Sequence, residues 1–145
     1  MFLGKFEHSL DDKNRVVLPL AYRRDMSEEK LQEGFVIFAG SDEQYLELHT
    51  KEKWLLHSEE LKKAYAAQGK AGEQDLIDLY SNAYEVQLDK QYRFIVPDSS
   101  MELAGIKRDV VFVGMTEKAV IYSRERWEVR EKGRRKARSA QAKGS

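Results

Sequence analysis

The feature that most limits how this chain can fold is a motif that it contains twice. The segment FEHSLDDKNRVVLP aligns with YEVQLDKQYRFIVP at an offset of 78 residues, and the copies end on Pro19 and Pro97, the only two prolines in the sequence. The aligned positions share Glu, Leu, Asp, Arg and Pro, and each copy has an apolar triplet before its proline. A repeat of this length predicts two copies of one structural unit.

The match between the copies resumes downstream. GFVIFAG resembles DVVFVG, and Trp54 falls against Trp127 at a shorter offset. We therefore expect the second copy to lack residues mainly between its short helix and its third strand. Each copy is predicted to form strand, turn, strand, short helix, strand, turn, strand and helix. The strands are expected around residues 2–9, 15–18, 35–39, 45–49, 110–113 and 119–122, with turns at Gly40-Ser41-Asp42 and Gly114-Met115-Thr116.

Both prolines are expected to end a strand and begin a helix. Proline has no N–H to donate to a ladder, and its fixed φ suits the first turn of a helix. The short helices are LAYRRDM and DSSMELAGI. We expect the second to be capped by Asp98, Ser99 or Ser100.

Longer helices are predicted after each copy. Thr50 can cap KEKWLLHSEELKKAYAAQ, and GKAGE is expected to break the chain before a further helix in EQDLIDLYSNAY. Ser123 can cap RERWEVREK, which Gly133 is expected to interrupt.

Together these elements predict an α+β fold. Neither half has enough strand to close a core alone, so we expect the halves to pack about a pseudo-two-fold axis, with flanking helices. The expected segments are a half-module at 1–50, a helical connection at 51–81, a second half-module at 82–123, and a C-terminal helix with a basic tail at 124–145.

Composition excludes several classes of site. The chain has no cysteine, which excludes disulfides, thiolate catalysis and cysteine-ligated metals, and suits a reducing cytoplasm. No apolar run approaches the roughly 20 residues of a membrane span. MFLGKFEHSL lacks the pattern of a signal peptide.

Charge is unevenly distributed along the chain. From Arg130 onward the chain has seven basic residues and one acid, a charge of +6, and the preceding residues carry −6. A basic tail on an acidic body is typical of nucleic-acid-binding proteins. Taken alone, these charges favour a solvated, frayed C-terminus over a binding segment.

The repeated Asp-x-x-x-Arg turn is the best candidate for a binding site. Asp11 and Asp89 can each accept hydrogen bonds from backbone N–H groups and fix the turn. Arg15 and Arg93 then leave the turn in a defined direction, and a guanidinium can engage guanine or a phosphate with two hydrogen bonds. The alternative, which the spacing alone favours, is that Asp11 and Arg15 pair with each other and only hold the turn. Most exposed pairs of this kind contribute under about 1 kcal/mol and recognise nothing.

These motifs resemble the MraZ family of bacterial proteins. The opening MFLGKFEHSLDDKNRVVLP, the second LDKQYRFIVP and the strand-plus-tryptophan pieces carry the resemblance, which covers nearly the whole chain. The resemblance implies an AbrB-like fold related to MazE and SpoVT, in which two half-modules form a swapped-hairpin β-barrel. It also implies ring-like homo-oligomers that bind tandem DNA repeats at the promoter of the division and cell-wall gene cluster.

Carried over by position, the DNA-contacting turn falls on Asp11, Lys13, Asn14 and Arg15, and the second motif on Asp89 and Arg93. Lys90, the cation of the second turn, is expected to contact DNA as well. Asp11, Asp89, Pro19 and Pro97 are implied to hold the turns and strand ends. The family commonly has glycine before the arginine. Asn14 tolerates the left-handed φ that this glycine adopts and Tyr92 does not, so we expect Arg15 to be the stronger DNA contact.

The resulting hypothesis is a sequence-specific, double-stranded-DNA-binding transcriptional regulator in the cytoplasm, associated with the nucleoid, that represses its own gene cluster. The alternative is an antitoxin-like protein-interaction module with incidental DNA binding. We expect no enzyme activity, cofactor, metal or membrane partner, because no nucleophile–base pair or metal-ligand spacing occurs. His8, His49 and His57 are expected at the surface or its rim. Trp54 and Trp127 are expected as core or interface anchors.

Overall fold

The two sequence copies share one β-sheet. The computed structural model describes residues 1–40, 42 and 44–144, so Ser41 of the expected first hairpin turn lies outside the described residues. The elements in chain order are β1 (Lys5–Ser9), β2 (Arg15–Val17), α1 (Leu20–Arg23), α2 (Glu28–Glu33), β3 (Phe35–Ala39), β4 (Leu46–Thr50), α3 (Lys51–Ala66), α4 (Gly69–Ser81), β5 (Tyr84–Val86), β6 (Arg93–Ile95), α5 (Asp98–Ala104), β7 (Asp109–Gly114), β8 (Lys118–Ser123) and α6 (Arg124–Gly144).

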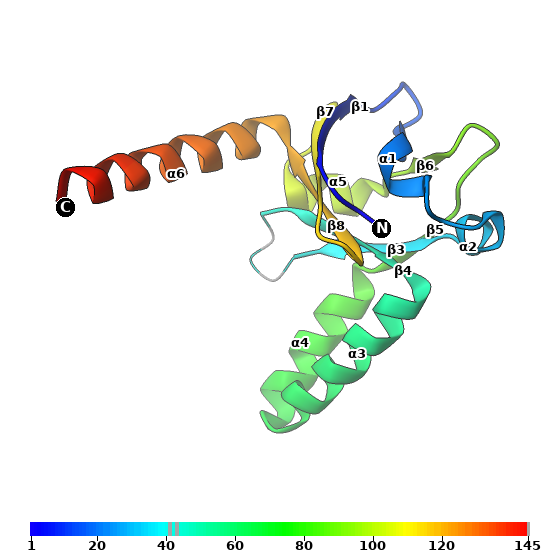
Figure 1. Cartoon of the computed structure of the whole chain (residues 1–145). Helices are drawn as coiled ribbons and strands as arrows, with labels where there is room; N and C mark the ends of the chain where they lie inside the picture. Colours follow the sequence, from blue (N-terminus) through cyan, green and yellow to red (C-terminus); the bar gives the residue numbers. More distant parts are fainter. Residues whose placement is uncertain (41, 43, 145) are drawn as a thin grey trace.

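Sheet topology follows the repeat. The larger sheet has the strand order β1-β7-β8-β4-β3-β5, and β2 pairs with β6 in a separate two-stranded ribbon. Strands β1 to β4 of the first copy correspond to β5 to β8 of the second. Exchanging each strand with its counterpart reverses the strand order of the larger sheet but leaves every pairing in place, as the symmetry of the repeat requires. Each half lends a strand to the other, because β1 pairs with β7 and β5 pairs with β3. The α+β, double-repeat, swapped-hairpin fold with flanking helices is therefore confirmed (Figure 1).

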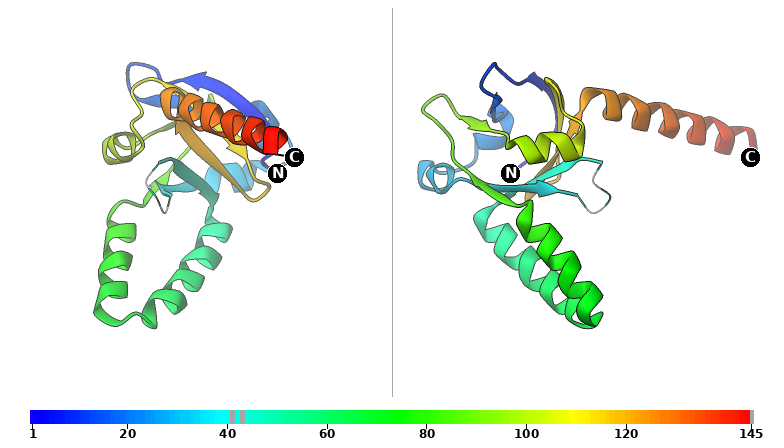
Figure 2. Two further views of the ribbon diagram at one scale, coloured as in Figure 1. Left: turned by 90° about the vertical axis from the view of Figure 1, so that its left-hand side faces the viewer. Right: turned by 180° about the vertical axis from the view of Figure 1, so that it is seen from behind.

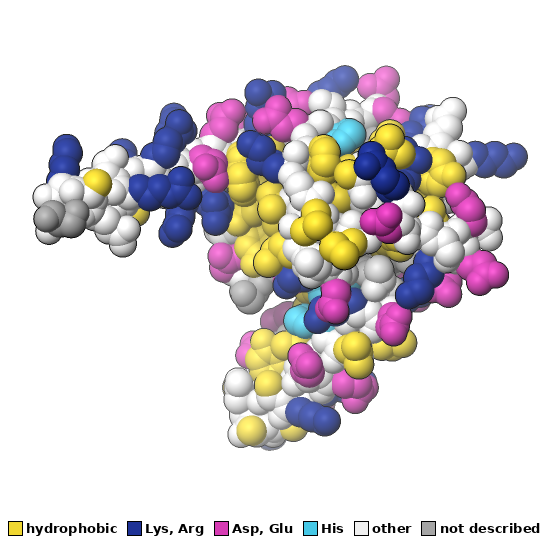
Figure 3. Space-filling view, viewed as in Figure 1, with side chains coloured by type: hydrophobic (Ala, Val, Ile, Leu, Met, Phe, Trp, Pro, Cys, Tyr) yellow, Lys and Arg dark blue, Asp and Glu magenta, His cyan; other side chains and the backbone are white. Residues whose placement is uncertain are grey.

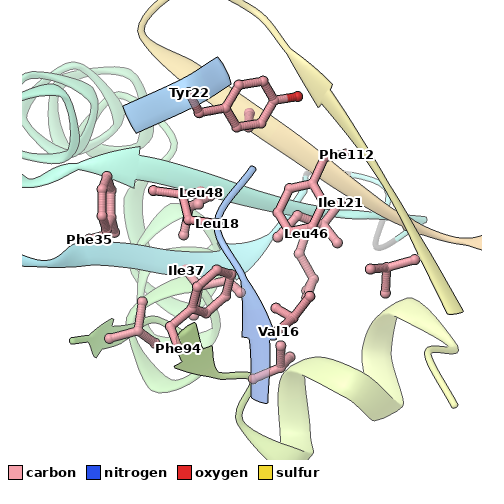
Figure 4. Close-up of a cluster of buried hydrophobic side chains, with 14 of the residues drawn as sticks. Val16, Leu18, Tyr22, Phe35, Ile37, Leu46, Leu48, Phe94, Phe112 and Ile121 are labelled. Atoms are coloured by element: carbon pink, nitrogen blue, oxygen red, sulfur yellow. The ribbon is translucent and has the colours of Figure 1, made fainter. Parts of the chain in front are cut away.

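A single core lies between the sheet, the ribbon and the short helices. Val16 of β2 and Phe94 of β6 face each other in register and are both buried. They pack into one cluster with residues of both copies, shown in Figure 4. The labelled members are Val16, Leu18, Tyr22, Phe35, Ile37, Leu46, Leu48, Phe94, Phe112 and Ile121. Because both copies contribute, the halves are expected to fold together.

Helix α2 accounts for the longer first copy. It lies between the short helix α1 and the third strand β3, where the alignment places the extra residues. Ser27 caps it by accepting a hydrogen bond from the Lys30 N–H at 3.2 Å. The second copy runs from α5 directly to β7.

Two predicted helix caps are confirmed and one is wrong. Thr50 accepts a hydrogen bond from the Lys53 N–H, and the Ser123 hydroxyl accepts one from the Arg126 N–H. Helix α5 begins directly after its proline. Pro97 occupies the N-cap position, and within the described chain no side chain caps this helix, because the polar side chains expected there lie inside it.

Of the two predicted helix breaks, the one at GKAGE is misplaced and the one at Gly133 does not occur in α6. Helix α4 begins at Gly69, so GKAGE lies inside it and the bend falls at residues 67–69, where Gly69 has a φ of 64°. Helix α6 continues through Gly133 to Gly144. Strong helix formers flank Gly133, and one glycine costs a helix only about 1 kcal/mol. The division of the chain at residues 50, 81 and 123 stays a prediction.

The tryptophans lie outside the buried core. Trp54 and Trp127 are half-buried, on the first turns of the helices that follow β4 and β8. Trp54 packs on Phe38 with ring centroids 4.9 Å apart, and Trp127 packs on Tyr122 at 5.3 Å. Of the apolar residues at the start of the chain, Phe2 is buried in the core and Leu3 is exposed.

Two helical parts project from the body in different directions. Helices α3 and α4 form a hairpin on one side of the sheet, and α6 extends from the end of β8 (Figures 1 and 2). No helix within the described residues is both long and apolar enough to cross a membrane.

Candidate nucleic-acid interface

The first turn is built around one carboxylate. Asp11 Oδ1 accepts hydrogen bonds from the backbone N–H groups of Lys13 and Arg15, both at 2.9 Å. Asp11 Oδ2 accepts a third from Arg15 Nε at 2.7 Å. The backbone closes the same turn, since Asp11 N donates to the Arg15 carbonyl. The predicted pairing is confirmed, and it orients the arginine as well as fixing the loop.

The second turn repeats this geometry. Asp89 Oδ1 accepts from the backbone N–H groups of Gln91 at 2.8 Å and Arg93 at 2.9 Å, and Asp89 Oδ2 accepts from Arg93 Nε at 2.8 Å. Each arginine thus commits its Nε–H to its aspartate, which leaves Nη groups able to donate to a ligand.

These hydrogen bonds keep both aspartates ionised. The backbone N–H of Arg15 is the largest cause of the lowered pKa of Asp11, and the backbone N–H of Arg93 plays the same part for Asp89. A carboxyl with a lowered folded pKa contributes its stabilisation above its unfolded pKa and loses it as the pH falls through the folded value. The anchors are therefore charged near neutral pH.

The prediction that Tyr92 resists the turn geometry is wrong. Asn14 and Tyr92 both adopt a left-handed conformation, with φ of 60° and 62°. The Asn14 carbonyl accepts a hydrogen bond from the Val96 N–H, and the Tyr92 carbonyl accepts one from the Leu18 N–H, both at 2.9 Å. Each bond joins a turn to the end of the other copy's strand. This pairing holds Tyr92 at a φ that costs an ordinary residue about 1–2 kcal/mol.

The Tyr92 side chain also stabilises its turn. The Arg23 guanidinium lies 4.1 Å from the centre of the Tyr92 ring, a cation–π distance. The Tyr92 hydroxyl donates to Glu28 Oε1 at 2.9 Å. Glu28 belongs to α2, which only the first copy has, so this support is specific to the second turn.

The ribbon brings the two arginines onto one surface. Arg15 pairs in register with Ile95, and Arg93 with Val17, while the intervening Val16 and Phe94 point into the core. Side chains alternate along a strand, so the paired outer positions face away from the core. Arg93 Nη1 also lies 3.9 Å from Asp11 Oδ2, which links the two turns.

Both lysines of the turns are exposed. Lys13 and Lys90 lie at the turn tips, and neither forms an ion pair with any residue that the structure describes. The two turns lie close together at one end of the molecule, in the loops after β1 and β5 (Figures 1 and 2). The structure thus gathers the four predicted basic residues at one end of the barrel.

A buried polar cluster lies outside this surface. His49 Nε2 is 3.1 Å from Glu47 Oε1, and Lys118 Nζ donates to the same oxygen at 2.7 Å. The prediction that His49 lies at the surface is wrong: β4 lies centrally in the sheet, and Phe38 and Trp54 cover the imidazole. Within the described residues, no three His, Asp or Glu side chains are placed to hold a metal ion.

This cluster predicts an acid-dependent stability. Burial by itself raises the pKa of Glu47, but hydrogen bonds from His49 and Lys118 bring it from 4.5 down to about 2. At pH 7 we expect Glu47→Gln to lower the free energy of unfolding by about 3 kcal/mol. That loss should shrink as the pH falls from about 4.5 toward 2, where wild type loses the same contribution.

Urea unfolding at several pH values measures the effect. Glu59→Gln, which changes an exposed carboxylate on α3, is the control and should be near neutral throughout. A cost of Glu47→Gln that does not vary with pH would contradict the assignment.

Comparison with known proteins identifies the family. The chain matches the family described as "MraZ protein, putative antitoxin-like" over residues 1–76 and 79–143. It is 34% identical over 128 residues to the "Transcriptional regulator MraZ" of Clostridium tetani (strain Massachusetts / E88), covering 88% of this chain and 85% of the relative. The proteins of the same name from Clostridium botulinum (strain Alaska E43 / Type E3) and Heliobacterium modesticaldum (strain ATCC 51547 / Ice1) are each 35% identical over 127 residues, covering 88% of this chain and 84% of theirs. The chain therefore belongs to the MraZ family, and the relatives that it matches are named transcriptional regulators.

Proposed function

We propose that this protein represses transcription of its own division and cell-wall gene cluster by binding tandem DNA repeats at the promoter as a homo-oligomeric ring. The observation that carries the proposal is the pair of aspartate-anchored arginines on the outer face of the β2–β6 ribbon. The relatives' name supports a regulatory role. Such a regulator acts in the cytoplasm, at the nucleoid.

The chemistry of the turns suits base recognition. A guanidinium held by its Nε–H can present two further donors, which match guanine O6 and N7 in the major groove or the oxygens of one phosphate. Lys13 and Lys90 suit flanking phosphates, because an ammonium group needs no fixed geometry. We assign base contact to Arg15 and Arg93 and backbone contact to the lysines, with Asn14 as a further polar contact.

One protomer should bind DNA weakly. Residues 11–15 carry two acids and two bases, and residues 89–93 carry one acid and two bases, so the turns have little net charge. Several protomers that meet several repeats gain affinity from effective concentration, without any new contact. The proposed oligomer and the proposed tandem repeats therefore depend on each other.

Exposed apolar side chains support self-association. Met1, Leu3, Leu56 and Met115 are large apolar residues with half or more of their surface accessible. Phe2 pairs with Thr116, which brings Leu3 and Met115 together, and Met1 and Leu56 line one cavity. Figure 3 shows hydrophobic side chains gathered in patches on this face. A ring interface is the proposed use of this surface.

Footprinting on the DNA upstream of the gene tests the function. We expect the wild-type oligomer to protect repeats at regular spacing, and to protect the same fragment with scrambled repeats at least tenfold more weakly. Weaker protection of the scrambled fragment would reflect contacts with the bases, since binding to the phosphates alone does not distinguish the two fragments. Equal protection of both fragments would contradict sequence-specific regulation.

The family description, antitoxin-like, supports a second candidate. If the protein acts as an antitoxin-like module, we expect a stable complex with a protein partner and no protection of the DNA repeats in the footprint. Footprinting beside size-exclusion chromatography of protein complexes separates the two.

A further inference from the structure

The second half of α6 forms a basic arm, which we define as residues 132–144. It contains six cations and no acid: Lys132, Arg134, Arg135, Lys136, Arg138 and Lys143. In the part of the chain that the structure describes, the arm buries no residue, and these six side chains form no ion pairs. Dark blue side chains mark its surface in Figure 3. The arm is therefore a strongly charged element that the fold itself does not use.

The chemistry of the arm selects a polyanion as its partner. Its apolar side chains are three alanines, too small to form the apolar stripe that docks a helix on a protein or a membrane surface. At 100° per residue, Lys132, Arg135, Lys136 and Lys143 fall within an arc of about 100°. Helix geometry gives the arm a length of about 20 Å, over which a DNA duplex presents about 12 phosphate charges. Charge complementarity thus favours duplex DNA.

Charge repulsion within the arm also favours a polyanionic partner. Lys132 and Lys136 are four residues apart, as are Arg134 and Arg138, and like charges at this spacing destabilise a helix. No packing offsets the repulsion, because the arm buries nothing. A bound polyanion would neutralise these charges and stabilise the helix.

The direction of the arm separates it from the turns. In Figure 1 the turn after β1 lies at the top and the turn after β5 at the upper right, while α6 runs to the left, away from both; the reverse view in Figure 2 agrees. A duplex seated on the turns of one protomer therefore lies at the opposite end of that protomer from the arm. DNA on the arm must be another segment.

We propose that the basic arm is a second, sequence-independent DNA site, which lets the protein hold a DNA segment other than the one bound by its turns. Binding by the arm itself needs no sequence recognition, and bridging rests on the proposed binding of the repeats by the turns. Together the two sites make the protein a bridge between DNA segments.

Binding to a random-sequence duplex without repeats tests the arm alone. The arm variant changes all six cations to glutamine in the full chain, and Lys62→Gln/Lys63→Gln/Lys70→Gln on the other projecting element is the control. We expect the arm variant to bind at least tenfold more weakly at low salt, and the slope of log K against log salt to become shallower by up to about 5. Affinity and slope equal to those of wild type would overturn the proposal.

A two-duplex capture experiment tests bridging. Repeat DNA is immobilised, protein is added, and a labelled random duplex follows. We expect wild type to retain the label, and the arm variant to bind the repeats but retain less than a tenth of it. Equal retention by the arm variant would assign bridging to the turns and overturn the proposal. Failure of wild type to bind the repeats would contradict the repressor function, while the random-duplex titration would still decide the arm.

Discussion

Replacing both Arg15 and Arg93 with alanine is expected to weaken binding to the tandem repeats at least a hundredfold. A good bidentate contact between arginine and a base contributes about 1–3 kcal/mol, so losing two contacts per protomer removes much of the binding free energy. In an oligomer that meets several repeats, each protomer loses the same contacts, so the affinity falls further. Arg15→Ala and Arg93→Ala alone are each expected to lose a similar part of the binding free energy, because the two turns have the same hydrogen bonds. Fluorescence anisotropy on labelled repeat DNA measures the effect.

The fold and the oligomer should survive these changes. The side chains of Arg15 and Arg93 are about a quarter exposed, and they pair at the surface with aspartates whose backbone hydrogen bonds remain. Exposed ion pairs contribute about 1 kcal/mol or less. Arg124→Ala, which breaks a pair with Glu128 on α6, is the matched control and should leave repeat binding unchanged. Wild-type affinity in the double variant would contradict the assigned site, and loss on Arg15→Ala alone would restore the asymmetry predicted from Tyr92.

The sequence predicted the symmetry of the fold because the repeat is a global constraint. Two copies of one unit, neither able to close a core, favour packing about a pseudo-two-fold axis, and the exchange of strands between the halves was implied by the family resemblance. The turn geometry at Asn14 followed from its residue type. That at Tyr92 did not, because its φ is set by a hydrogen bond to Leu18 from the other copy. Local preference yields there to tertiary structure.

The remaining errors arise where the local sequence signal is weak or where the structure depends on a distant segment. Gly133 suggested a helix end, but a single glycine is a weak signal among strong helix formers. His49 was predicted at the surface, but it lies on β4, which pairs with β8 of the other copy inside the sheet, and the sequence around His49 does not show that pairing. The residues proposed to contact DNA could be located from the motif alone. That both arginines share one ribbon required the β2–β6 pairing, which is not local.

Phe94→Ala is expected to lower the free energy of unfolding by about 4 kcal/mol, since removing a fully buried phenylalanine leaves a cavity. Its neighbour Ile95 is the matched control: it lies on the same strand, is 58% exposed, and its change to alanine should be near neutral. Urea unfolding of both variants measures the difference.

The Phe94 change also tests whether the two copies form one cooperative unit. Phe94 belongs to the second copy, yet it pairs in register with Val16 of the first, and residues of both copies surround it in the core cluster. If the halves share one core, the whole barrel should unfold in a single transition at lower denaturant, and tyrosine signals from both copies should change together. Two separate transitions, with the first copy unaffected, would show that the ribbon joins two independent cores. The arginine surface would then lack the rigid base on which recognition by two turns depends.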